Sequence, residues 1–221
     1  MIGPTSVATT KTRTLLVGGG VAGPLFVVVA VVQAFARAGF DVRRHPLSLL
    51  SLGDLGWIQI SNFVVAGMLF VGCAVGMRRV LGPGRGGTWG PRFIGVFGVS
   101  LIAGGIFVAD PAFGFPPGTP EGMPDRLSWH GIVHAVAPVV GFLSLIAATF
   151  ALARVFASLR QRGWAAYSAA TGVVVLALSA WPSTENFLPL WVATVLGFGW
   201  ASAIAARLHQ QHPRDTSAET T

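Results

Sequence analysis

The sequence predicts an all-α integral membrane protein, a bundle of six transmembrane helices with both termini in the cytoplasm. Three observations support this prediction. Hydrophobic residues make up 52% of the 221 residues and charged residues only 10%, whereas a soluble domain of this size carries about 25% charged residues. The apolar residues are gathered in six runs near the ~20 residues that span a bilayer. Most of the basic residues lie in alternate connections between these runs.

The six runs are expected to be helices because a helix satisfies its own backbone hydrogen bonds in lipid. None of them shows the alternation of a membrane β-strand. The first run follows Lys11 and Arg13 and is longer than the apolar core of a signal peptide, so we expect an uncleaved span. The expected segments are an N-terminal segment at 1–14, spans at about 15–36, 57–77, 92–109, 129–153, 164–181 and 189–206 within a transmembrane domain at 15–207, and a polar tail at 208–221.

The basic residues orient these spans. Eleven of the 15 Lys and Arg residues lie in the N-terminal segment, the second and fourth connections and the tail. By the positive-inside rule, this side is cytoplasmic, and the protein is a multi-pass protein of the cell (cytoplasmic) membrane. The net charge of +7 is then a topology signal, and no nucleic-acid partner is expected. The four basic residues on the other side are Arg37, Arg43, Arg44 and Arg126.

The outer connections are long and contain most of the acidic residues, so a functional site is expected on this side. The apolar stretch 47–55 in the first of them is too short to span and is expected to form a helix lying at the interface. The acidic residues of these connections are Asp41, Asp54, Asp110, Glu121, Asp125 and Glu185.

A group of polar residues is expected at the outer end of the bundle, because ionisable groups in or near a span usually face the bundle interior or a water-filled cavity. His130 and His134 are four residues apart, which places them on one face of a helix. Asp110 closes the third span on the same side. Asn62 lies at a comparable depth in the second span, and Glu185 lies in the last outer connection.

Three interpretations of this group remain open. His130, His134 and Asp110 suit a zinc or iron site with an open position for water, and metal-bound water is a nucleophile at neutral pH. Alternatively, His134 donates a structural hydrogen bond to Asp110 or to a loop carbonyl while His130 is solvated.

In the third interpretation, desolvation raises the pKa of Asp110 and Glu185, and one of them acts as a general acid on a lipophilic substrate such as a prenyl chain. The competing view is that both are solvated acids that balance Arg126 or Arg44.

Several segments of the chain match the pattern of a known family. They are His45-Pro46-Leu47-Ser48, Gly53 to Gln59, Ser61-Asn62-Phe63, Gly105 to Pro111, Gly114 to Gly118, and Gly131 to His134 with Pro138. In these segments the sequence resembles the domain-of-unknown-function 998 family of small prokaryotic membrane proteins. The resemblance covers nearly the whole chain and implies a six-helix membrane protein, with the family's recurrent polar residues at Asn62, Asp110 and His134. It implies no reaction.

The expected function is the binding of a membrane lipid or other lipophilic small molecule at the outer-leaflet end of the bundle. Asp110, His134 and Glu185 are the candidate catalytic residues, and the candidate ligand-binding residues are Asn62, Trp57, His130 and Asp54. The alternative is a membrane enzyme, either a metal-dependent hydrolase or a carboxylate acid-base catalyst. Glycine-rich helix faces also allow two copies of the chain to pack as a homodimer.

Overall fold

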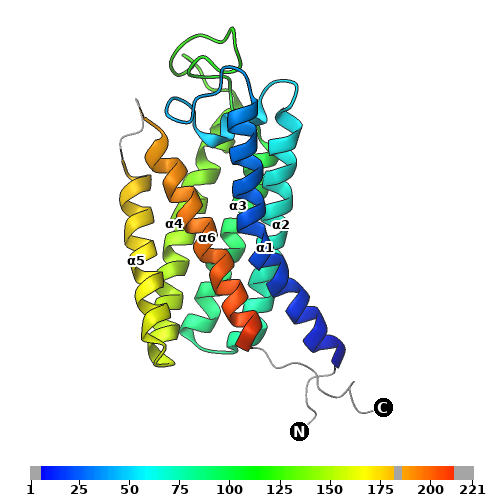
Figure 1. Ribbon diagram of the computed structural model, residues 1–221, viewed down its shortest axis with the longest axis vertical. Coiled ribbons are helices and arrows are strands. Elements are labelled where there is room, and N and C mark those ends of the chain that lie inside the picture. Colours follow the sequence, from blue (N-terminus) through cyan, green and yellow to red (C-terminus); the bar gives the residue numbers. More distant parts are fainter. Residues whose placement is uncertain (1–5, 182–185, 212–221) are drawn as a thin grey trace.

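The computed structural model describes residues 6–181 and 186–211. Within these ranges the chain forms six α-helices, one short 3-10 helix and no strand element (Figure 1). This confirms the predicted all-α fold class. The elements are α1 (Ser6–Ala36), η1 (Leu47–Ser51), α2 (Gly56–Leu81), α3 (Arg85–Ile106), α4 (Trp129–Ser158), α5 (Arg162–Ser179) and α6 (Leu188–Gln211).

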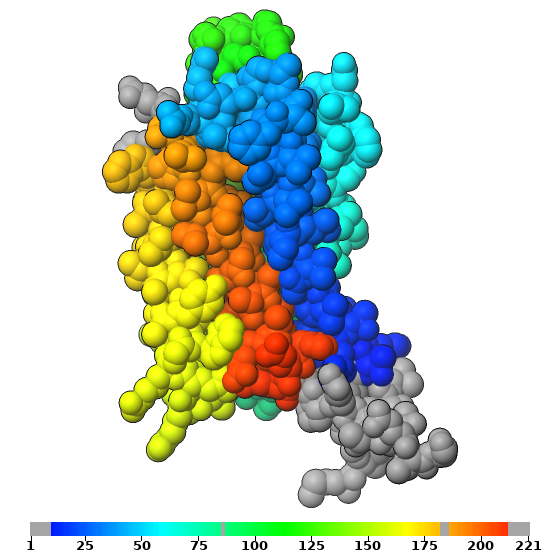
Figure 2. All heavy atoms as spheres, viewed as in Figure 1, coloured from blue at the N-terminus to red at the C-terminus, as the bar shows by residue number. Residues whose placement is uncertain are grey.

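The helices form a closed ring in chain order. Each helix packs against the one before and the one after it, and α6 packs back against α1. Figure 2 shows α6 between α1 and α5 on one face of the molecule. The ring has two ends. We call the end that bears the connections 37–55 and 107–128 the loop end, and the end where α1 begins and α6 finishes the terminal end (Figure 1).

Five of the helices are long and apolar enough to cross a membrane, namely α1, α2, α3, α4 and α6. The chain is therefore an apolar helical membrane protein. α5 has 18 residues, or about 27 Å at 1.5 Å per residue, and is not among the five. The six expected helices are present, but only five meet the requirements for a span.

Several observed boundaries differ from the expected ones. α1 and α3 begin earlier, at Ser6 and Arg85, because the polar residues before each apolar run continue the helix. α3 ends at Ile106, since Phe107 has an extended backbone. α6 continues to Gln211, so the tail expected from residue 208 begins as a helix; residues 212–221 lie outside the described part.

Aromatic rings fill the middle of the ring of helices. Phe26 of α1 stacks on Phe198 of α6, with ring centroids 4.4 Å apart. Phe63 of α2 lies 5.2 Å from Phe26, and Phe97 of α3 lies 5.0 Å from Phe198. Four helices thus meet through their phenylalanines, and these rings form a layer beneath the loop end.

Glycines allow α1 to approach α6. A Cβ at Gly23 would lie 2.4 Å from the carbonyl oxygen of Phe198, so only glycine fits there. Ser202 of α6 accepts a hydrogen bond from the Gly23 amide and donates one to the Gly19 carbonyl. The Gly19 and Gly23 face is therefore used within the chain, as expected for small residues at a helix contact.

The connections 37–55 and 107–128 cover the end of the helix ring, and side-chain contacts hold them in place. The guanidinium of Arg37 donates to the Leu50 carbonyl, and Arg44 forms an ion pair with Glu121. His45 is buried and bonds the Phe113 carbonyl. η1 also packs into this cap, with Leu49 and Leu50 buried. The helix expected at 47–55 is thus a 3-10 helix limited to Leu47–Ser51, and two of its leucines pack on the end of the bundle. Its position at the membrane interface stays a prediction.

Candidate functional site

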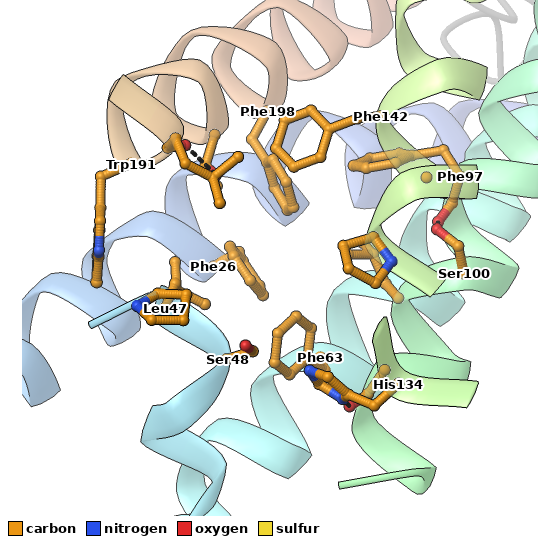
Figure 3. A pocket seen from close by; sticks show the side chains of 17 residues that line it. Phe26, Leu47, Ser48, Phe63, Phe97, Ser100, His134, Phe142, Trp191 and Phe198 are labelled. Carbon is orange, nitrogen blue, oxygen red and sulfur yellow. Dashed lines mark hydrogen bonds between the residues drawn. The ribbon is translucent and has the colours of Figure 1, made fainter. Parts of the chain in front are cut away.

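Two cavities lie in the half of the bundle next to the loop end. The first, which we call the inner cavity, has a volume of about 150 Å³ and lies between α1, α2, α3, α4, α6 and the 37–55 connection. Six Phe and Trp side chains line it (Figure 3). They are Phe26, Phe63, Phe97, Phe142, Trp191 and Phe198.

The second cavity, the rim cavity, has a volume of about 550 Å³ and is bounded by the two long connections and the first turns of α4. Asp110 lines it together with the backbone and apolar side chains of the 107–128 connection. Pro46, Ser48, His134 and Pro138 line both cavities. The two cavities therefore adjoin at these four residues, one apolar and one with a carboxylate in its wall.

His134 is the ionisable side chain at this junction. It is only 5% exposed, and its Nδ1 lies 2.7 Å from the Phe107 carbonyl oxygen and 3.1 Å from that of Gly104. A carbonyl can only accept, so Nδ1 has the proton and donates. Nε2 is buried and has no hydrogen-bond partner. In a neutral ring, Nε2 is then an unused acceptor at the junction of the cavities, and Figure 3 shows His134 beside Phe63 at the edge of the inner cavity.

The end of α3 explains why two histidines occur four residues apart. The last carbonyls of a helix have no partner within the helix. His134 donates to the carbonyls of Gly104 and Phe107, and His130 Nδ1 lies 2.9 Å from the carbonyl of Val108. The pair therefore satisfies the C-terminal end of α3 from the adjacent helix. The structural interpretation of His134, donation to a loop carbonyl, is confirmed.

Asp110 caps the beginning of α4. One carboxylate oxygen accepts from the Ser128 hydroxyl at 2.6 Å and the other from the Ser128 amide at 2.7 Å. Ser128 is itself the N-cap of α4, and its hydroxyl accepts from the Gly131 amide at 3.0 Å. A Cβ at Gly131 would lie 2.0 Å from Asp110 Oδ2, so glycine is required for this approach.

The hydrogen bond from the Ser128 hydroxyl lowers the pKa of Asp110 more than desolvation raises it, and the hydrogen bond from the Ser128 amide lowers it further. The expected rise in the pKa of Asp110 was therefore wrong. The physical reason is that hydrogen bonds to a carboxylate favour its ionised form. Asp110 is an anion that positions α4 and forms part of the rim cavity wall, and it has no proton to give as a general acid at neutral pH.

The expected metal ligands do not assemble in the described part of the chain. Within residues 6–181 and 186–211, no group of three His, Cys, Asp or Glu side chains is arranged to hold a metal ion. Asp110, His130 and His134 lie near one another, but each histidine directs Nδ1 to a carbonyl of the α3 end.

The other expected site residues lie elsewhere. Trp57 is 64% exposed and Asp54 is exposed in the connection before α2, and neither lines the two cavities. His130 and Asn62 do not line them either. Glu185 lies outside the described residues.

Asn62 belongs to a buried amide cluster that the sequence analysis did not recognise. Its Nδ2 donates to the Phe26 carbonyl of α1 and lies 3.3 Å from Gln59 Oε1, which also accepts from Gln33 Nε2 at 2.8 Å. The amide cluster, Gln33, Gln59 and Asn62, thus joins α1 to α2. Gln33 and Gln59 could have been identified by the argument used for Asn62, since each is a polar residue inside an apolar run. Ser48 had no such signal, because it is a small polar residue in a connection.

The comparisons with known proteins agree with the resemblance found in the sequence. A family model described as a protein of unknown function (DUF998) matches residues 21–209. This range includes every residue that lines the two cavities. No curated protein and no solved structure matches the chain.

Proposed function

The chain belongs to the DUF998 family of membrane proteins of unknown function, and from its geometry we propose that it binds a lipophilic or amphipathic small molecule in the two adjoining cavities. The apolar part of the ligand occupies the inner cavity and its polar part lies in the rim cavity. The observation that supports this most strongly is the buried Nε2 of His134, which has no partner and lies where the cavities meet. Leaving such a group unpaired costs roughly 1–3 kcal/mol, so a bound partner stabilises the site.

The dimensions and the lining agree with this proposal. Ligand sites are mostly apolar pockets of about 300–1,000 Å³ with a few polar groups, and the rim cavity has about 550 Å³. Gly104 of α3 is buried and lines the inner cavity, yet a Cβ there would have no atom within 4 Å. The inner cavity is therefore open at Gly104, and a side chain at this position would occupy the space of the ligand.

The proposal includes an orientation of the bundle in the membrane. We place the loop end at the outer leaflet of the cytoplasmic membrane, because ten of the 14 basic residues in the described ranges lie toward the terminal end and four lie at the loop end. Two basic residues at the loop end have structural partners: Arg37 bonds the Leu50 carbonyl and Arg44 pairs with Glu121. The ligand would then enter from the outer leaflet or the outer surface.

Ligand binding is favoured over the enzyme alternatives by particular observations. The hydrolase needs three assembled ligands, which the described residues do not supply. An acid-base catalyst with Asp110 as the general acid needs this carboxyl protonated, whereas the hydrogen bonds from Ser128 lower its pKa; Glu185, the other candidate acid, lies outside the described residues.

The proposal is tested by filling the inner cavity. The chain, Gly104→Leu and Gly199→Leu are purified, and their organic extracts are compared by mass spectrometry. Gly199 is the matched control, because it is also a helix glycine with no atom within 4 Å of a built Cβ, but it is exposed on α6. We expect a lipophilic compound in the parent and in Gly199→Leu that is lost from a folded Gly104→Leu. Identical extracts from all three proteins would contradict the proposal.

A further inference from the structure

The polar groups of the site restrict the chemistry of its ligand. We propose that the ligand has a hydrogen-bond donor, a hydroxyl or a protonated amine, next to its apolar part, and that His134 Nε2 accepts from this donor. This inference rests on the proposed function and narrows it from any lipophilic molecule to donor-headed amphiphiles.

The first step of the argument is the placement of the proton on His134. Nδ1 faces two carbonyl oxygens, at 2.7 Å and 3.1 Å, and both require a donor. A second proton on Nε2 would make a buried cation whose new N–H has no acceptor within the chain, which is costly. Nε2 therefore presents a lone pair. A ligand atom that contacts it must donate, so an ether, an ester carbonyl or an ionised carboxylate does not satisfy it.

The second step is the charge of the cavity walls. Among the described residues that line the two cavities, none is Lys or Arg, and the single charged side chain is the carboxylate of Asp110. The hydroxyl of Ser48 lies at the junction and can also accept. Phosphate and carboxylate head groups are usually bound by Arg or Lys. An anionic head group would be repelled by the Asp110 carboxylate and could not donate to His134 Nε2. A hydroxyl or an ammonium group can donate to either of these acceptors.

The third step is the size of the apolar part. The inner cavity has about 150 Å³, and an apolar cavity of about this volume accommodates a benzene molecule. The six aromatic side chains around it suit a ring or a short hydrocarbon end. A donor attached to such a group by a short chain can reach His134 at the edge of the cavity.

Four probes of similar size test the proposal: phenylpropanol, phenylpropylamine, phenylpropanoate and the methyl ether of phenylpropanol. Their binding to the full chain in nanodiscs is measured by equilibrium dialysis, and binding to nanodiscs with Gly104→Leu is subtracted as lipid partitioning. We expect the alcohol, the amine or both to bind roughly fivefold to tenfold more tightly than the ether and the carboxylate, which is the effect of one hydrogen bond to a buried group. The order of the alcohol and the amine then shows which donor the site prefers.

Two substitutions of His134 separate its two nitrogens. His134→Asn keeps a donor at the position of Nδ1 and removes the acceptor at Nε2, whereas His134→Gln keeps an acceptor at the position of Nε2. We expect Asn to abolish the preference for the donors and Gln to retain it. His130→Asn is the matched control, because His130 also bonds a carbonyl near the α3 end but lines neither cavity. This variant should show the same preference for donor probes as the parent.

The outcomes distinguish this inference from the function on which it rests. If the ether or the carboxylate binds the parent as tightly as the donors do, or if His134→Asn leaves the preference intact, the inference is wrong and ligand binding still stands. If none of the four probes binds the parent better than Gly104→Leu, the proposed function is wrong as well.

Discussion

At the scale of single residues, the polar side chains near the cavities have two different tasks. Asp110 and Nδ1 of His134 satisfy helix ends, since Asp110 holds Ser128 at the start of α4 and His134 holds carbonyls at the end of α3. Nε2 of His134 has no task within the chain. A single imidazole thus connects the structure of the bundle to the cavities, and the functional proposal rests on its free nitrogen.

The lowered pKa of Asp110 predicts a loss of stability in acid. Since the pKa of Asp110 lies below its ordinary value of 3.8, its contribution is complete above that value and is lost as the pH falls through the lowered pKa. We expect Asp110→Asn to unfold more easily than the parent at neutral pH, with a smaller difference near pH 3 (an acid condition below the ordinary carboxyl pKa). Unfolding free energies measured between these pH values test this.

Glu121→Gln is the control for this experiment. Glu121 is also a loop-end carboxylate, but its ion pair with Arg44 is exposed, and exposed pairs contribute about 0–1 kcal/mol. The substitution should change the stability little at either pH. Equal pH profiles for Asp110→Asn and the parent would show that the Ser128 hydrogen bonds do not stabilise the fold.

At the scale of elements, the contact between the α3 end and the α4 start depends on Gly131. A methyl group there would lie 2.0 Å from Asp110 Oδ2, so Gly131→Ala must displace the carboxylate from Ser128. We expect a loss of about 1–3 kcal/mol, as for other overpacked sites. In Gly163→Ala, by contrast, the added methyl group meets no atom within 4 Å, and we expect a gain of about 0.4–1 kcal/mol. The unfolding free energies of both variants test this comparison. Equal changes in the two variants would contradict the close contact between Gly131 and Asp110.

The amide cluster predicts a specific link between α1 and α2. Gln59 Oε1 accepts from both Gln33 and Asn62, while the Nε2 of Gln33 and the Nδ2 of Asn62 also bond carbonyls of α1. We expect Gln59→Leu to cost about 0.6–2 kcal/mol, the range measured for hydrogen bonds between membrane helices. The unfolding free energy in bicelles measures this cost, and a variant as stable as the parent would show that the cluster contributes no stability.

At the scale of the whole molecule, the orientation can be tested by cysteine labelling. In a Cys73→Ala background, which removes the buried native thiol, single cysteines are introduced by Asp125→Cys at the loop end and by Ser158→Cys at the terminal end. Both positions are exposed. We expect an impermeant maleimide added to intact cells to label only Asp125→Cys. Labelling of Ser158→Cys alone would reverse the proposed orientation.

The sequence was sufficient to predict the fold class and the order of the helices, because long apolar runs separated by polar residues have few structural solutions in lipid. It also selected His134 and Asp110 as candidates, since ionisable groups at such places are costly, and both line the rim cavity. It could not reveal the use of these groups. The raised pKa expected for Asp110 failed because Ser128, which lies 18 residues away, supplies two hydrogen bonds.

The cavities could not be predicted either, because they are made by residues from five helices and from the connections at the loop end. Ser48 and Gly104 are small residues of a common type, and only the packing around them makes one a wall of both cavities and the other an opening. The role of α5 could not be predicted from its apolar run, since α5 is a helix of the ring but is not among the five candidate spans, although its 18 residues meet the length requirement.

The most direct test of the central claim is the nitrogen NMR spectrum of His134 in isotope-labelled protein, recorded with and without phenylpropanol. His134→Asn assigns the signal, and His130 serves as the internal reference. We predict that Nε2 is unprotonated before the alcohol is added and that its resonance then shifts as it accepts the hydroxyl proton, while the His130 signals stay in place. A protonated Nε2, or an Nε2 signal that moves neither with saturating phenylpropanol nor with saturating phenylpropylamine, would contradict the account.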